Sequence, residues 1–121
     1  MPAHIEVEFD EARQIIRQRV GGELEVEDFE RIDELTRACA ARLHNPGDVR
    51  ILVDATGLGR SSARARRAMI AALKRPTLTR MAVLTPGPIG RVILRFLVVA
   101  TGAERARGFA SEDEAVTWLL S

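Results

Sequence analysis

The stretch "ILVDATGLGRSS", residues 51–62, holds the residue types best suited to binding an anion. An apolar run that ends in an acid leads into two glycines, an arginine and two serines. Backbone N–H groups at the start of a helix, together with an arginine, can hold a phosphate. The candidates for such an anion-binding or phosphorylation site are Gly57, Gly59, Arg60, Ser61 and Ser62, with Arg64 and Arg67 in the helix expected next.

The spacing of these residues matches neither common phosphate-binding loop. A Walker loop needs G-x-x-x-x-G-K-[ST], and both its spacing and its lysine are missing. The dinucleotide pattern fails as well, because Ser62 stands where the third glycine is required. The plainer interpretation is a turn that uses the positive φ of glycine, followed by a serine that caps a helix. Anion binding and phosphorylation of Ser61 or Ser62 stay open as alternatives.

No residue pair in the sequence has the spacing of an acid–base or nucleophile–base couple, so we expect no catalytic residue, metal or cofactor. Asp54 ends a buried strand, where a capping or turn role is expected. His4 and His44 have no partner at metal-ligand spacing. Cys39 falls on the apolar stripe of a helix, which predicts a buried, inert thiol. A single cysteine forms no internal disulfide, so a reducing cytoplasm is the expected location.

Hydrophobic periodicity predicts a hairpin and a helix in the first third of the chain. "HIEVEF" alternates strictly, and "QIIRQRV" reads as a second strand that ends at Gly21-Gly22, with "DEAR" as the turn. From Val26 to His44 the period becomes helical, and "NPGD" ends the helix.

Strands and helices alternate in the remaining two thirds. "VRILVD" and "RMAVLT" predict buried strands, and "ERARGF" predicts a short one. Helices are expected from the serines at 61–62 to before Pro76, from Pro88 to about Thr101, and over "SEDEAVTWLL", which begins with a capping box. In this last helix the side chains expected to face inward are Ala115, Val116, Leu119 and Leu120, with Trp118 at the margin. The order predicts one α/β domain over residues 1–121, with a four- to five-stranded, mostly parallel sheet, an N-terminal hairpin and about four helices.

The helix expected at residues 88–101 is apolar around most of its circumference, and only Arg91 and Arg95 mark a polar edge. Such a helix must be covered on more than one side. A homodimer contact, internal burial, and a lipid-like ligand or membrane surface are the alternatives. The residues predicted for this interaction surface are Ile89, Val92, Ile93, Phe96, Leu97 and Val99.

Charge is spread unevenly although the formal net charge is +1. Residues 1–48 carry 12 acids and 6 bases, whereas residues 49–109 carry 2 acids and 12 bases. A basic patch can attract anions, or it can simply face the acidic half of the chain. Nucleic-acid binding is not expected, because no aromatic platform or recognition motif accompanies the charge. The longest nearly apolar run, residues 92–100, is too short for a transmembrane segment, which needs ~20 residues.

Three stretches, "GELEVEDFERI", "VRILVDATG" and "ERARGFASEDEAVTWLL", carry a recognisable pattern. Together with the element order, they resemble the SpoIIAA-like branch of the STAS group (sulfate transporter and anti-sigma-factor antagonist). The resemblance in pattern covers essentially the whole chain.

The resemblance implies a cytoplasmic, non-enzymatic interaction or regulatory module with a protein partner, which can be a second copy. The related CRAL-TRIO fold carries lipids, which implies a carrier or sensor of a small amphipathic or anionic ligand as the alternative. In regulatory antagonists of the group, a serine in an Asp-Ser-Ser-Gly-type motif after the third strand is phosphorylated. The corresponding residues here are "RSSA", where Arg60 and Ala63 replace the acid and the glycine.

Overall fold

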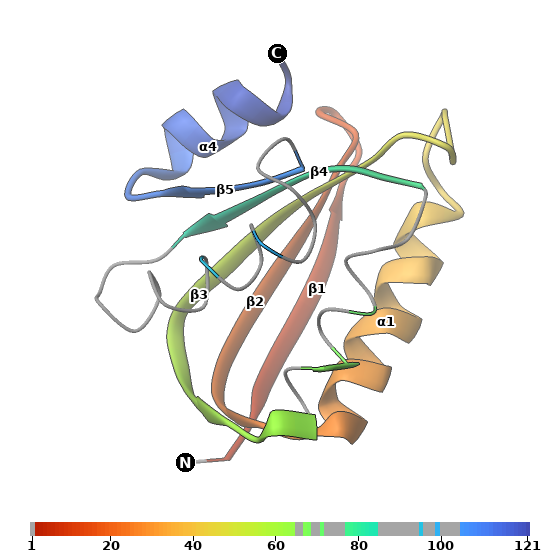
Figure 1. Cartoon of the computed structure of the whole chain (residues 1–121). Helices are drawn as coiled ribbons and strands as arrows, with labels where there is room; N and C mark the ends of the chain where they lie inside the picture. Colours follow the sequence, from red (N-terminus) through yellow and green to blue (C-terminus); the bar gives the residue numbers. More distant parts are fainter. Residues whose placement is uncertain are drawn as a thin grey trace.

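The computed structural model describes residues 2–64, 67–68, 71, 77–84, 95, 99 and 105–121, with Arg60 and Ser61 described in their backbone alone. Figure 1 shows the arrangement of its elements. The elements are β1 (His4–Asp10), β2 (Ile15–Leu24), α1 (Val26–Ala40), β3 (Val49–Ser61), β4 (Leu78–Leu84), β5 (Ala106–Phe109) and α4 (Glu112–Leu119). These residues therefore include two of the four predicted helices. The stretches of the other two, at 62–75 and 88–101, lie largely outside the described residues.

The strands form one five-stranded sheet in the order β1-β2-β3-β4-β5. β1 and β2 pair antiparallel as a hairpin, and every later pair is parallel. The predicted hairpin and the predicted mostly parallel sheet are both confirmed. α1 supplies the crossover that the parallel neighbours β2 and β3 need between them.

The face of the sheet toward α1 holds the larger apolar core. It joins aliphatic side chains of β2, β3 and β4 to Ile32 of α1, and Phe29 and Cys39 of α1 pack against its margin. Its buried members are Ile16, Val20, Leu24, Ile32, Leu43, Val49, Ile51, Val53, Leu78, Met81, Val83 and Ala106. α1 packs on β1 and β2, as Figure 1 shows.

The opposite face holds a smaller core under α4. Leu52 of β3 and Ala82 of β4 pack there against Ala115 and Leu119 of α4. The predicted cap of this helix is confirmed, because the Ser111 side chain accepts a hydrogen bond from the Glu114 backbone N–H. Ala115 and Leu119 face inward as predicted, but Leu120 does not. It follows the last helical residue, and 47% of it is exposed.

The glycine-containing stretches of β2 and β3 both form strand. The predictions that the second strand ends at Gly21-Gly22 and that a glycine turn follows Asp54 are therefore wrong. β2 continues through Gly21 and Gly22, and β3 continues through Gly57 and Gly59 to Ser61. Gly21 pairs with Gly57, and a Cβ on Gly21 would lie 3.3 Å from the Gly57 carbonyl oxygen. Among the described glycines only Gly22 has a positive φ, 73°. The glycines after Asp54 therefore serve close approach of two strands, and the predicted turn at this position is wrong.

α1 ends four residues earlier than predicted, at Ala40. The next residues form tighter turns, in which the Arg42 N–H donates to the Cys39 carbonyl and the Leu43 N–H donates to the Ala40 carbonyl. These turns still direct the side chain of Leu43 into the core, where 7% of it is exposed. Leu43 therefore reaches the core from the turns after the helix, not from the helix itself.

Candidate functional site

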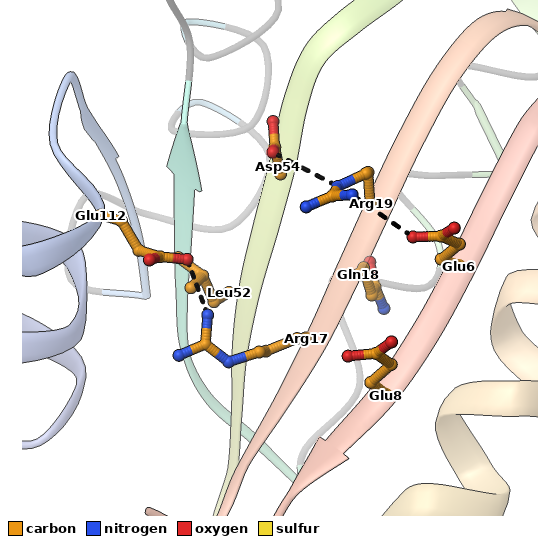
Figure 2. Close-up of a pocket in the computed structure, with 8 residues that line it drawn as sticks. All are labelled: Glu6, Glu8, Arg17, Gln18, Arg19, Leu52, Asp54 and Glu112. Carbon is orange, nitrogen blue, oxygen red and sulfur yellow. Dashed lines mark hydrogen bonds and ion pairs between the residues drawn. The ribbon is translucent and has the colours of Figure 1, made fainter.

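Charged side chains line a shallow channel on the face of the sheet opposite α1 (Figure 2). The channel has a volume of about 100 Å³ and crosses β1, β2 and β3 beside the N-terminus of α4. Its charged lining residues are Glu6, Glu8, Arg17, Arg19, Asp54 and Glu112. In the described part of the chain, no helix covers this strip of the sheet.

The positions of the charges along β1 and β2 put them on one face of the sheet. Side chains along a strand point to opposite faces in turn, so the apolar residues of β1 face α1 and its acids face the channel. In the hairpin register Glu6 lies opposite Arg19 and Glu8 lies opposite Arg17. The sequence therefore sets two pairs of opposite charge directly across the hairpin.

Arg19 connects three strands through its ion pairs. Its Nη1 lies 3.6 Å from the Glu6 carboxylate on β1, and its Nε lies 3.7 Å from the Asp54 carboxylate on β3. The side chain of Arg19 is 63% exposed, so water screens both pairs. Exposed pairs of this kind contribute ~0.2–1 kcal/mol each.

Arg17 connects the hairpin to α4. Its guanidinium lies 2.7 Å from the Glu112 carboxylate and 3.5 Å from that of Asp10. Burial raises the pKa of Asp10, but hydrogen bonds and charge from Arg13, together with the charge of Arg17, outweigh burial and hold that pKa below its ordinary value. Because Arg17 reaches toward Glu112, the carboxylate of Glu8 makes no ion pair with any described residue.

Asp54 makes a local hydrogen bond within β3 and an ion pair that the sequence does not predict. One carboxylate oxygen accepts a hydrogen bond from the Thr56 backbone N–H at 3.1 Å. The other oxygen faces Arg19, which is distant in sequence. Sequence reasoning missed this pair because the register between two parallel strands joined by a helix cannot be read from their residues.

The channel presents paired charges on an open surface. Arg17 faces the carboxylate of Glu112, and Arg19 faces those of Glu6 and Asp54. Within the described residues, no three His, Cys, Asp or Glu side chains gather as metal ligands would.

The predicted anion site lies at the other end of β3, beside the N-terminus of α1. Ser61 pairs with Leu24 at the end of β2, and the Ser62 hydroxyl lies 3.5 Å from the Glu25 carboxylate. Ser62, Arg64 and Arg67 are exposed. The structure therefore places Ser62 near an acid, a neighbour that the sequence did not suggest.

The start of α1 is strongly acidic. Glu25 is the N-cap residue, Glu27 and Asp28 lie in the first turn, and the Glu25 backbone N–H donates to the Asp28 carboxylate at 2.8 Å. These acids complement the positive end of the helix dipole. A phosphate on Ser62 would meet the negative charge of Glu25 at once.

Most of the predicted interaction surface lies outside the described residues. Ile89, Val92, Ile93, Phe96 and Leu97 lie outside the described residues, whereas Val99 is described and is 86% exposed. Cys39 is half-buried against the core, and burial raises the pKa of its thiol. A raised pKa keeps the thiol protonated and supports the prediction of an inert cysteine.

A five-stranded mixed sheet with α1 on one face and α4 on the other places the protein among small α/β domains. Comparison with known proteins identifies its family. A family model described as SpoIIAA-like matches residues 15–120, and the chain belongs to the SpoIIAA-like family. The predicted resemblance is therefore confirmed. A search of curated proteins gives no match.

Two crystal structures share the fold over nearly the full chain. An uncharacterised protein with a SpoIIAA-like fold from Shewanella loihica PV-4 has a TM-score of 0.72 and 23% sequence identity, covering 97% of this chain and 93% of its own. An anti-sigma factor antagonist from Mycobacterium paratuberculosis has a TM-score of 0.68 and 15% identity, covering 99% of this chain and 96% of its own. In the described part of this protein, no helix has the length and apolar character to cross a bilayer.

Proposed function

We propose that the protein is a non-enzymatic regulatory module that acts in the cytoplasm by binding another protein. The observation that carries this proposal is the likeness of the whole chain to an anti-sigma factor antagonist, a protein named for its action on another protein. The channel supports it, since arginines pair there with the carboxylates of Glu6, Asp54 and Glu112. A single free cysteine with a raised pKa suits a reducing compartment.

The binding surface we propose is the segment after β3 together with the start of α1. Ser62, Arg64 and Arg67 are exposed there, next to the carboxylate of Glu25. The surface therefore presents basic and acidic groups side by side. Such a pattern favours a partner with a complementary pattern of charge.

We propose a charge on Ser62 as the switch of this surface. The Ser62 hydroxyl is 3.5 Å from the Glu25 carboxylate, so a phosphate would be repelled by that acid and would move the segment away from α1. Ser62→Asp is expected to change partner affinity by about tenfold, and Glu25→Gln is expected to reduce this effect. Ala110→Asp adds the same charge at an exposed loop position and serves as the matched control.

Site-specific photo-crosslinking in the source cells tests the proposed surface. A photo-reactive amino acid in place of Arg64 is expected to give one defined protein adduct, whereas the same amino acid in place of Asp113 on α4 gives none. The adduct at position 64 should change in yield with Ser62→Asp and stay unchanged with Ala110→Asp. Equal labelling at both positions, or no adduct at position 64, would contradict the proposal.

We also propose that the apolar residues at 89–99 form a contact between two copies. Val99, the described member of the predicted set, exposes 86% of its surface, and an exposed aliphatic side chain gains from being covered. Light scattering after size exclusion is expected to give a dimer mass at micromolar concentration and a monomer mass for Val99→Asp. A strict monomer for the wild type would rule the dimer out.

A further inference from the structure

A second and larger cavity lies at the end of the sheet where the β1–β2 turn, the α1–β3 connection and the end of the chain meet. Its volume is about 340 Å³, within the range of small-ligand sites. It lies apart from the channel of Figure 2 and shares no lining residue with it. Its walls combine an apolar part with cationic and hydrogen-bonding groups.

The apolar part of the cavity consists of two leucines. Leu43 is buried and connects the cavity to the main core, whereas Leu120 exposes 47% of its surface. Few large apolar side chains in the described residues are as exposed as Leu120. An apolar group in the cavity would cover it, and covering apolar surface favours binding.

The polar part of the cavity presents donors to a negative group. The Arg13 side chain is 52% exposed, and Asp10, the acid it contacts, is shared with Arg17. Asp10 therefore offsets the charge of Arg13 incompletely. His44 lines the same cavity, and an imidazole side chain carries an N–H donor.

The one carboxylate among the residues that line the cavity, Asp48, is paired with Arg50, which lines the cavity too. Asp48 accepts hydrogen bonds from Arg50 at 3.1 and 3.3 Å, and Thr79 donates a further one. These bonds hold the Asp48 carboxylate against β3 and β4, so it does not cancel the charge that Arg13 presents.

Gln14 fixes the two walls relative to each other. Its backbone has a φ of 57°, the left-handed conformation that residues other than glycine adopt at a cost. Its side chain donates to the Glu11 carbonyl at 2.7 Å and accepts from the His44 backbone N–H at 2.9 Å. The turn that carries Arg13 is therefore joined to the segment that carries His44 before any ligand binds. A preformed site of this kind loses less entropy on binding.

We propose that this cavity binds a small organic carboxylate, with the carboxylate at Arg13 and His44 and a short aliphatic tail over Leu43 and Leu120. The volume favours a tail of a few carbon atoms over a full lipid chain. This proposal stands independently of the protein-binding function, because it uses none of the residues assigned to that surface.

Chemical-shift titration of the full chain with a series of carboxylates tests the proposal. Acetate, butyrate and hexanoate are expected to bind with increasing affinity, by about two- to fourfold for each added methylene. The shifts should centre on residues 13–14, 43–45 and 120. Hexanol and hexylammonium, which keep the tail and change the head group, are expected to bind at least tenfold more weakly than hexanoate.

Two variants separate the roles of the head group and the tail. Arg13→Gln is expected to weaken hexanoate binding about tenfold or more, since a hydrogen bond to a charged group is lost, whereas Arg19→Gln in the Figure 2 channel leaves it unchanged. Leu120→Ala is expected to reduce the gain from acetate to hexanoate. The proposal is overturned if hexanoate gives no saturable shifts, if hexanol binds as tightly, or if inorganic phosphate matches hexanoate.

Discussion

Gly22 shows how one residue decides the path of a strand. It lies inside β2 with a φ of 73°, and a Cβ at this position would collide with the carbonyl of Pro2. Any other residue would have to keep a strained backbone and displace the chain before β1. Gly22 therefore allows β2 to continue beyond the point where the hairpin was expected to end.

Gly22→Ala is expected to lower the free energy of unfolding by about 1–3 kcal/mol, because strain and a close contact are added together. Gly47→Ala is the matched control, since a Cβ there meets only the side chain of Asn45 at an ordinary 3.5 Å. It should change stability by less than about 0.5 kcal/mol. Urea denaturation of both variants measures the difference, and equal effects would show that the Gly22 conformation is not required.

Asp48 makes stability depend on pH at the acid end. Hydrogen bonds from Thr79 and Arg50 hold its pKa below the ordinary value of 3.8. Because the pKa is lower in the folded state, the charged Asp48 side chain stabilises the protein fully above pH 3.8, the ordinary pKa that applies to the unfolded chain. This stabilisation is lost as the pH falls through the lower pKa of the folded state. The contribution is small, about 0.5 kcal/mol, because the side chain is 36% exposed and water screens it.

Asp48→Asn is therefore expected to be less stable than the wild type at pH 6, with the difference shrinking below pH ~4. Urea denaturation between pH 3 and pH 6 checks this, and Asp113→Asn on the surface of α4 corrects for the loss of one negative charge. A difference that stays constant across this range would assign the Asp48 effect to hydrogen-bond geometry alone.

α4 is a short helix that arginines of the sheet hold at both ends. Arg17 pairs with Glu112 in its first turn at 2.7 Å, and Arg80 donates to the Trp118 carbonyl at 2.6 Å near its last. Arg50, which pairs with Arg80 in the register of β3 and β4, donates to the Leu119 carbonyl. Cations at the C-terminal end satisfy free carbonyls and complement the helix dipole. The helix has only eight residues, so these contacts contribute much of the stability with which it is held against the sheet.

Arg80→Gln is expected to loosen α4 while leaving the rest of the sheet intact. Loss of a charged hydrogen bond to helix carbonyls should lower local stability by about 1–2 kcal/mol, which speeds amide exchange in residues 115–119 by about five- to thirtyfold. Arg107→Gln is the control, since Arg107 contacts the Trp118 ring without capping the helix. Amide exchange followed by NMR measures both, and equal acceleration in β2 and β3 would contradict a local role for Arg80.

Elements with a strong local pattern were predicted, whereas the register between strands that are distant in the sequence was not. The alternation of "HIEVEF" and the capping serine of "SEDEAVTWLL" determined β1 and α4 within a few residues. The stretch "ATGLGRS" reads as a turn because glycine weakens isolated strands, yet pairing with the glycines of β2 makes it strand. The Arg19–Asp54 and Ser62–Glu25 neighbours depend on the same register, so the residues of the site could be suggested but their partners could not.

The molecule divides its sheet into an apolar face and a mixed face. The face toward α1 is filled by aliphatic residues, and the other face carries α4 on one half and charged pairs on the other half. The two kinds of surface contribute very differently to stability. Burial of aliphatic groups dominates, because exposed ion pairs are screened and contribute little.

Ile16→Ala and Arg19→Ala are expected to show this difference. Ile16 is fully buried in the main core, so its truncation should cost about 2–5 kcal/mol. Arg19 makes two exposed pairs, and its truncation should cost less than about 1 kcal/mol and still less in 1 M salt. Urea denaturation with and without salt compares them, and a cost above 2 kcal/mol for Arg19→Ala would show that the channel is a structural centre.

The position of Trp118 gives the protein a built-in optical reporter. It is the only tryptophan in a chain without tyrosine. The guanidinium groups of Arg80 and Arg107 lie 5.1 and 5.3 Å from the centre of its ring, and the ring of Phe109 lies 5.6 Å away. Emission excited at ~295 nm therefore comes from this one indole. A red shift of that emission would follow α4 leaving the sheet, without any label added to the chain.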